Sequence, residues 1–155
     1  MMDPTYFREI ERVTEGIIRI GVVDSVLHDE GKCRVKLGDR LSHKLKFIAP
    51  RAGDDKVYWP PDVGEQVLIL SPGGDDTAGF VLTGIFSNVK PLPEGAGENK
   101  FITEFKDGSR IEYDRDSHRL KLDIQGDIVI TATGDIRMES SGDVTIKGQN
   151  IHLNP

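Results

Sequence analysis

The stretch that decides the fold lies near the end of the chain and reads GDIVITAT (126–133), GDIRMESS (134–141) and GDVTIKGQ (142–149). Each block begins with Gly-Asp, and its third and fifth residues are apolar while most of their neighbours are polar. The preceding block, HRLKLDIQ (118–125), keeps the same apolar phase with a different start. This is the period-2 alternation of a β-strand inside a frame of eight residues, which predicts one short strand per block.

Two sets of residues in these blocks are predicted to have structural roles. Glycine accepts φ > 0 without a steric clash and Asp bonds to nearby backbone, so the Gly-Asp pairs are predicted to form the turns. The apolar third and fifth residues are predicted to form the core of a spike. The turn residues are Gly126, Asp127, Gly134, Asp135, Gly142 and Asp143, and the core residues are Leu120, Leu122, Ile128, Ile130, Ile136, Met138, Val144 and Ile146.

One copy of this ribbon has too little apolar surface to fold alone. A block offers two apolar side chains worth roughly 1.5–3 kcal/mol each when fully buried, whereas ordering its backbone costs about 8–16 kcal/mol. Three copies wound around one axis share a core and pair every strand edge. We therefore expect an intertwined trimeric β-helix or β-prism, although the repeat by itself also allows a single-chain β-solenoid or a plain antiparallel meander.

The residues before the repeats predict a separate all-β domain. A helical segment is expected over 1–16, an OB-fold barrel over 17–90, a Pro/Gly-containing linker over 91–99 and the spike over 100–155. Asp3 can cap the helix and Pro4 suits its first turn. The predicted strands are Ile17–Val26, Lys32–Leu37, Leu45–Ala49, Gln66–Leu70 and Gly79–Phe86, followed by a hairpin of Phe101–Lys106 and Arg110–Asp114 around an Asp-Gly turn.

Composition restricts the classes of function. The 155 residues carry a formal net charge of −6, whereas a general nucleic-acid binder is expected to be basic. No apolar run approaches the roughly 20 residues that span a bilayer, and the acidic N-terminus predicts no secretory signal. The lone cysteine, Cys33, cannot form an internal disulfide and is predicted to be a half-buried strand residue.

Several motifs in the base and the tail form a distinctive set. The base contains Ala49-Pro50-Arg51-Ala52-Gly53-Asp54-Asp55, Trp59-Pro60-Pro61-Asp62-Val63-Gly64-Glu65-Gln66-Val67-Leu68, Ser71-Pro72-Gly73-Gly74-Asp75 and Gly79-Phe80-Val81-Leu82-Thr83-Gly84. The tail contains Asp107-Gly108-Ser109, then Tyr113-Asp114, then the blocks of eight. This set resembles the phage baseplate assembly protein V family, the P2-like tail spike proteins, which are related to the spikes of type VI secretion.

The resemblance implies a structural, non-enzymatic spike at the centre of a virion baseplate, assembled in the cytoplasm of the host bacterium. It implies an OB-fold base that docks on a trimeric hub at the end of the tail tube. The homotrimeric spike, with its apex at the C-terminus, is expected to pierce the host outer membrane when the sheath contracts. The spike of a phage-derived bacteriocin or of a secretion system remains an alternative.

The last block, NIHLNP (150–155), departs from the apolar phase. If the phase holds, three His152 side chains meet on the threefold axis, and imidazole is a common ligand of iron, zinc, nickel and copper. P2-like members carry His-x-His here, with six ligands for iron, whereas this chain has His152 and Asn154. We expect a three-histidine metal site, with iron suggested only by the resemblance. A tip-capping protein, and a terminus with neither, stay open as alternatives.

Two other classes of function, an enzyme and a binding module, have weaker support in the sequence. The sequence has no Gly-x-Ser-x-Gly elbow, phosphate loop or His-Glu-x-x-His motif, and its acidic pairs (54–55 and 75–76) lie in predicted loops. An OB barrel can also bind oligonucleotides or saccharides, with Tyr58 and Trp59 as stacking platforms, although the net charge disfavours nucleic acid. The remaining histidines, His28, His43 and His118, are predicted to be solvated surface residues.

Overall fold

The computed structural model describes Thr5, Arg8, Ile10, Thr14 and residues 16–75 and 77–153. The chain divides into two compact units, Met1–Glu98 and Asn99–Pro155. The predicted N-terminal helix falls mostly outside the described residues, and those of its residues that are described have helical backbone. No helix within the described residues combines the length and apolar character that a membrane crossing requires.

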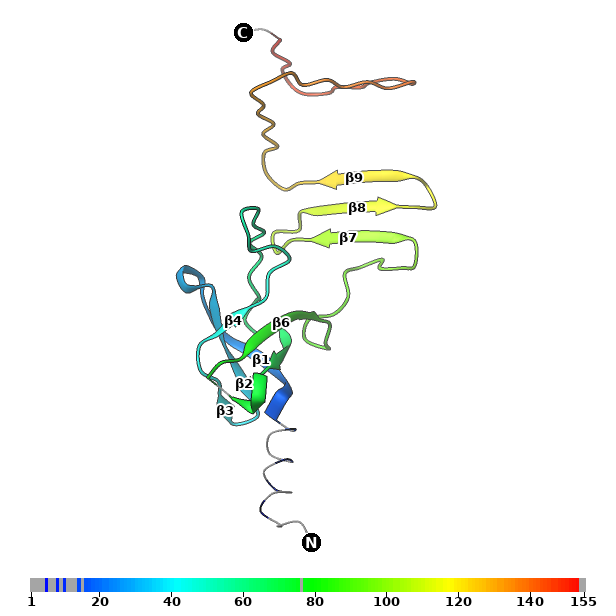
Figure 1. The fold of residues 1–155 in the computed structure, drawn as a ribbon. Helices are drawn as coiled ribbons and strands as arrows, with labels where there is room; N and C mark the ends of the chain where they lie inside the picture. Colours follow the sequence, from blue (N-terminus) through cyan, green and yellow to red (C-terminus); the bar gives the residue numbers. More distant parts are fainter. Residues whose placement is uncertain are drawn as a thin grey trace. The chain divides into compact units, whose positions relative to one another are not determined.

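The first unit contains a closed β-barrel (Figure 1). The strands pair in the order β1–β5–β6–β4–β2–β3, and an additional pairing of β1 with β2 closes a five-stranded barrel with β3 beside it. Strands β4 and β6 pair in parallel. This closed barrel confirms the predicted OB-like base. Its elements are β1 (Ile18–Leu27), η1 (His28–Glu30), β2 (Lys32–Leu37), β3 (Arg40–Leu41), β4 (Leu45–Phe47), β5 (Gln66–Leu70), η2 (Pro72–Gly74) and β6 (Phe80–Ile85).

The core of the barrel comes from alternate residues of its strands, as period-2 geometry requires. Closure places the inner face of β2 entirely inside, so Cys33 is fully buried rather than half-buried as predicted. The barrel is narrow at Gly21, where an added Cβ would lie 2.8 Å from the Lys36 carbonyl oxygen. The core residues are Val23, Cys33, Val35, Leu45, Val67, Ile69 and Val81.

The Asp62-Val63-Gly64-Glu65 part of the base motif joins β1, β5 and β6. The Glu65 carboxylate accepts hydrogen bonds from the backbone N–H groups of Asp62 (2.9 Å) and Gly84 (3.0 Å). The Val23 N–H donates to the Glu65 carbonyl (2.9 Å), and the Gly64 N–H donates to the Val23 carbonyl (2.8 Å). The motif therefore satisfies backbone groups at a bulge in β1, where the strand ladder shifts register.

The second unit begins with an antiparallel sheet of β7 (Lys100–Glu104), β8 (Arg110–Asp114) and β9 (Arg119–Asp123). At the β7–β8 turn, Ser109 donates to Asp107 through its N–H (2.9 Å) and its hydroxyl (3.0 Å). Gly108 in this turn has a φ of 86°, a conformation that favours glycine. The Gln125 N–H donates to the Ser109 hydroxyl oxygen (3.0 Å), which ties the end of the sheet to the turn.

The structure corrects several sequence-based expectations. Strand β4 stops at Phe47 rather than Ala49, β7 covers Lys100–Glu104 rather than Phe101–Lys106, and the short β3 was not predicted. The first repeat block also differs from expectation, because its residues Arg119–Asp123 form β9 and pair with β8 in an antiparallel meander. The following blocks form no such pairs within the described residues.

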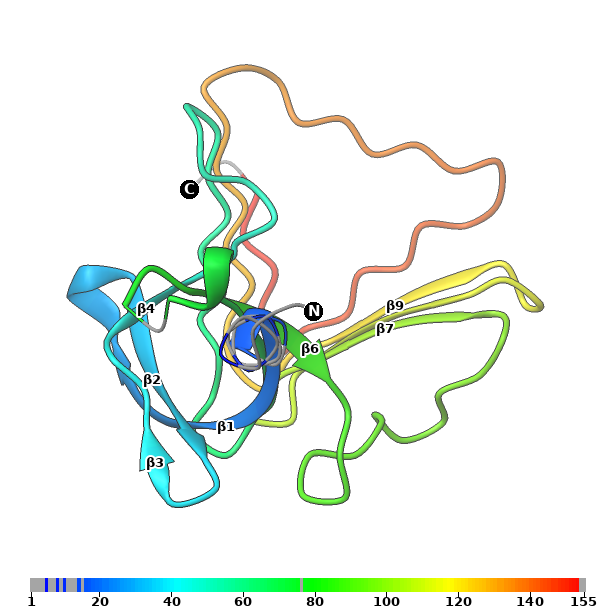
Figure 2. The same cartoon turned by 60° about the horizontal axis from the view of Figure 1, so that its bottom comes forward.

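Residues 124–153 run as extended chain without a strand assignment. The chain bends at Gln125-Gly126, Thr133-Gly134 and Ser141-Gly142, which are eight residues apart and coincide with the start of each Gly-Asp block. The later stretches overlap in Figure 1, but Figure 2 shows them running apart in different directions. The ribbon therefore winds in straight steps and does not fold back on itself as a hairpin.

Candidate functional site

The β7–β9 sheet has one apolar face. Phe101 lies opposite Tyr113, which lies opposite Leu120, and the next row on the same face contains Ile111 and Leu122. Phe101, Tyr113 and both leucines are exposed in the single chain. Leu120 and Leu122 belong both to this face and to the predicted spike core. The apolar face of the sheet thus includes the third and fifth residues of the first block, the same positions that are apolar in the later blocks.

The opposite face of this sheet is charged and paired. Lys100 contacts Glu112 (3.0 Å), and Arg110 contacts both Glu112 (2.9 Å) and Glu104 (3.1 Å). Hydrogen bonds from Lys100 and then from Arg110 hold the pKa of Glu112 below its ordinary value, and the bond to Glu112 raises the pKa of Lys100. The Lys100, Arg110 and Glu112 side chains are partly buried against one another, and their paired charges suit a face that remains in water.

The apolar stripe of the later blocks is uncovered in one chain. All third and fifth residues that the repeat predicts as core are exposed, including Ile128, Ile136 and Val144. Among the described residues, no strand lies against them. A contiguous exposed apolar stripe of this kind marks an interaction surface.

The repeat glycines do not have the conformation expected for them. Unlike Gly108, neither Gly126, Gly134 nor Gly142 has a φ in the left-handed region, so the prediction of positive-φ turns is wrong. An added Cβ at Gly126 or Gly134 would meet no atom of the same chain within 4 Å. Contacts within one chain therefore give no reason for glycine at these positions.

The predicted tip residue His152 is exposed, and its neighbour in the same block, Asn154, lies outside the described residues. Within the described part of one chain, no group of three His, Cys, Asp or Glu residues could hold a metal ion. A metal site at His152 would need ligands from other copies. Each chain offers one imidazole here, so three copies would supply three nitrogens and not the six that a His-x-His pair would give.

The barrel has an apolar outer face on β1, β5 and β6. Ile18 pairs with Leu70 and Ile20 pairs with Leu68, and these residues of β5 pair in turn with Phe80 and Leu82. These side chains alternate with the core residues and so point out of the barrel. Both isoleucines, Phe80 and Leu82 are exposed, which makes this face a second candidate interaction surface.

The aromatic pair considered as a stacking platform lies in the loop between β4 and β5. Tyr58 and Trp59 are both exposed. The Tyr58 hydroxyl lies 2.9 Å from Nδ1 of His28, and its ring centroid is 6.3 Å from that of Phe47. His28 thus has a side-chain partner that the sequence did not indicate. The acidic residues Asp54 and Asp55 are exposed in the same loop.

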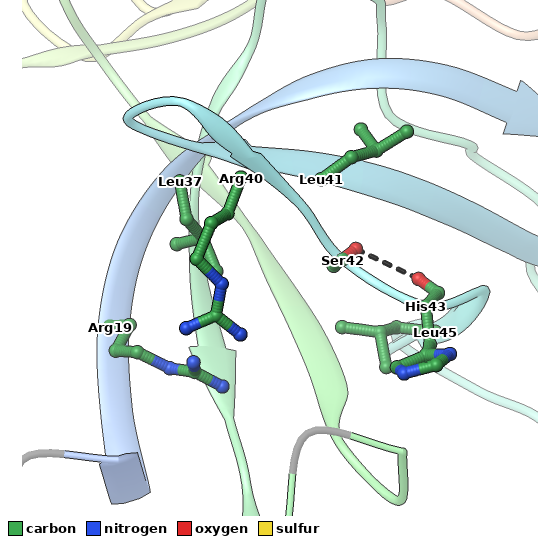
Figure 3. A pocket seen from close by; sticks show the side chains of 7 residues that line it. All are labelled: Arg19, Leu37, Arg40, Leu41, Ser42, His43 and Leu45. Atoms are coloured by element: carbon green, nitrogen blue, oxygen red, sulfur yellow. Dashed lines mark hydrogen bonds between the residues drawn. The ribbon is translucent and has the colours of Figure 1, made fainter.

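A small pocket that no sequence motif indicated lies near the start of β1 (Figure 3). Arg19 of β1 and Arg40 of β3 direct their guanidinium groups into this space. Arg19 also donates to the hydroxyl of the buried Ser71 (3.1 Å). The pocket has a volume of about 50 Å³ and is lined by Arg19, Leu37, Arg40, Leu41, Ser42, His43 and Leu45. The feature of the sequence that could have indicated this pocket is the concentration of basic residues over 32–46.

The closed five-stranded barrel places the first unit in the OB-like class of folds. Residues 19–86, which contain nearly the whole barrel, match the family model of the type VI secretion system/phage-baseplate injector OB domain. This match of the barrel confirms the family resemblance drawn from the motifs.

Among curated proteins, the chain is similar to the spike protein of Escherichia phage P2. The two are 35% identical over 129 residues, which make up 83% of this chain and 61% of the phage P2 protein. The chain therefore spans less than two thirds of the length of this relative. The similarity extends beyond the 68 residues of the matched domain, so it includes residues outside the barrel.

Proposed function

We propose that the chain is a structural central spike of a contractile tail baseplate and acts as a homotrimer. The observation that carries this proposal is the uncovered ribbon, in which the apolar residues of every later block are exposed and no strand pairs with residues 124–153. Two further copies would cover the apolar stripe and pair the strand edges. The similarity to a phage spike protein supports the same assignment.

In the proposed trimer, the apolar face of β7–β9 and the block stripe form one axial core. The paired charges of Lys100, Arg110 and Glu112 then face water. Stiffness follows because each strand edge is paired and the core is dry, so the spike transmits force along its axis. The role is mechanical and involves no catalysis.

The base is proposed to dock on the trimeric hub at the end of the tail tube. The apolar outer face of β1, β5 and β6, with Ile18, Ile20 and Phe80 exposed, supports a stable protein contact. The target is the host outer membrane, which the spike pierces during sheath contraction. The protein would be assembled in the host bacterial cytoplasm and reside in the virion baseplate.

We include a metal at the tip in the proposal. Three His152 nitrogens would bind it, and the ion would cross-link the three chains near their ends. Elemental analysis of the purified protein should find about one metal per three chains, with His152→Ala losing the metal while remaining trimeric. A trimer of the unaltered chain that contains no metal rejects this part alone and leaves a tip-capping protein as the alternative.

A bacteriocin or secretion-system spike would use the same trimer, so those alternatives differ in the particle and not in the mechanism. An oligonucleotide- or saccharide-binding module is the alternative of another class, and the exposed Tyr58 and Trp59 are the observation that favours it. Tight, salt-sensitive binding of single-stranded DNA would support that alternative.

Sedimentation velocity and native mass spectrometry of the full chain test the main proposal. Both should report a trimer at micromolar concentration, and the trimer should persist on a gel in detergent without heating. A folded monomer at this concentration would reject the proposed self-association.

A further inference from the structure

The basic residues of the base are concentrated in one segment. Residues 32–46 contain six Lys or Arg residues and one acidic residue, in a chain whose net charge is −6. Glu30 neutralises part of this charge through Lys44 (2.7 Å) and Lys32 (3.0 Å). Arg34, Lys36 and Lys46 form no ion pair within the described part of the chain. This side of the barrel therefore has a local positive potential that attracts anions.

The pocket near the start of β1 concentrates this potential at one point. The guanidinium groups of Arg19 and Arg40 enter the same space, with the His43 ring on the opposite side in Figure 3. Guanidinium groups that enter one space offer several N–H donors in a planar fork, an arrangement that suits an anion. The hydrogen bond from Arg19 to the buried Ser71 holds one guanidinium in place, which reduces the entropy lost on binding.

The size and lining of the pocket limit the ligand. A volume of about 50 Å³ holds a carboxylate group, whereas sites for small molecules such as nucleotides or sugars occupy roughly 300–1,000 Å³. Leu37 and Leu45 form apolar walls, which suit the methylene groups of an acidic side chain. Guanidinium forks match the planar geometry of a carboxylate.

The strand register places the pocket away from the point where the chain leaves the barrel. Ile18 at the start of β1 aligns with Leu70 and then with Phe80 at the start of β6. The end of β6, at Ile85, aligns with Gln66 and Val22, farther along these strands. The chain therefore leaves β6 at the end of the barrel opposite the pocket.

We propose that this pocket binds an aspartate or glutamate side chain, or a C-terminal carboxylate, of the protein on which the base docks. The inference rests on the proposed function, because it assigns chemistry to a contact between the base and the protein on which the base docks. Arg40 and Arg19 bind the carboxylate, and the surrounding Arg34 and Lys36 attract an acidic segment by long-range charge.

Titration of the full chain with an acetylated tri-glutamate peptide at low ionic strength tests the proposal. Backbone amide NMR signals of residues 40–45 should shift in a saturable manner. Arg40→Gln should weaken binding about tenfold through loss of the fork. The matched control Arg34→Gln removes the same charge from the outer face of β2 and should weaken binding less than about twofold. His43→Gln is a second pocket variant in case Arg40→Gln disturbs the barrel.

Equal losses of peptide affinity in Arg40→Gln and Arg34→Gln would show nonspecific attraction and overturn the pocket assignment. Amide shifts confined to residues outside 40–45 would also overturn it. Tighter binding of inorganic phosphate or of oligo-deoxythymidine than of the peptide would assign the pocket to phosphate and also overturn it. Sedimentation of the same samples separates this inference from the proposed function. A monomer rejects the spike, whereas a trimer without peptide binding rejects only the carboxylate site.

Discussion

Truncating Ile130 to alanine should weaken the association of the chains far more than the same change at Val129. The two residues are neighbours in one block, and both are exposed in the single chain. Because successive side chains of a strand point to opposite faces, only Ile130 faces the axis in the proposed trimer. Comparing the two variants therefore tests whether the position in the repeat, and not hydrophobicity alone, decides which side chains are buried.

The size of the effect follows from exposure. Ile130 is 71% exposed, and fully burying such a side chain is worth roughly 1.5–3 kcal/mol, so its burial in the trimer contributes about 1–2 kcal/mol per chain. Three copies contribute about 3–6 kcal/mol, which corresponds to about two to four orders of magnitude in the association constant. Val129 is 83% exposed and should change stability by less than about 0.5 kcal/mol, because it stays in water.

Guanidinium chloride titrations monitored by sedimentation and by circular dichroism measure this difference. The transition midpoint of Ile130→Ala should fall and depend on protein concentration, while Val129→Ala should follow the unaltered chain. An equal loss of stability in the valine and isoleucine variants would mean that the stripe has no defined axial face, and would refute the proposed packing.

Three further predictions concern single positions. Hydrogen bonds from the Ser109 N–H and hydroxyl hold the pKa of Asp107 below its ordinary value of 3.8. The ionised Asp107 therefore stabilises the folded protein above pH 3.8, and this stabilisation is lost as the pH falls through the lower pKa of the folded state. Asp107→Asn should therefore lower the melting temperature near pH 7 but not near about pH 2; an equal drop at both would contradict this. Burial raises the pKa of Cys33 to about 11, so a thiol reagent should modify it only during unfolding, and fast labelling of folded protein would disprove its burial. Gly21→Ala should destabilise the barrel by about 1–3 kcal/mol in denaturant melts, since the Cβ meets backbone; an unchanged midpoint would refute the tight packing.

Local alternation made much of the barrel predictable. The apolar residues of β2 lie at every second position, and β5 is a short continuous apolar run after Gln66. The sequence placed both strands at their observed bounds. The ends of β4 and β7 were less predictable, because hydrogen bonds to partner strands decide where a strand stops. The turn at Asp107-Gly108 was also predictable, since an Asp-Gly pair between β-runs has few other conformations.

Of the candidate interaction sites, the sequence predicted the apolar stripe but not the pocket. The phase of the repeats identified the exposed stripe from Ile128 to Ile146, because residues in a fixed period-2 order share a face. The pocket was not predictable, since Arg19 and Arg40 come from strands that the sequence does not show to be neighbours. The glycine turns were predicted with the wrong φ, because the sequence indicates where a bend occurs and not which dihedral makes it.

The sequence by itself determined the period of eight, the apolar phase and the two-part organisation, since these depend only on the order of side chains along a strand. The tertiary structure decided the closure of β1 on β2, the parallel pairing of β4 with β6 and the meeting of Arg19 with Arg40. Such contacts join residues far apart in the chain, and their selection depends on how the whole set of strands packs around one core.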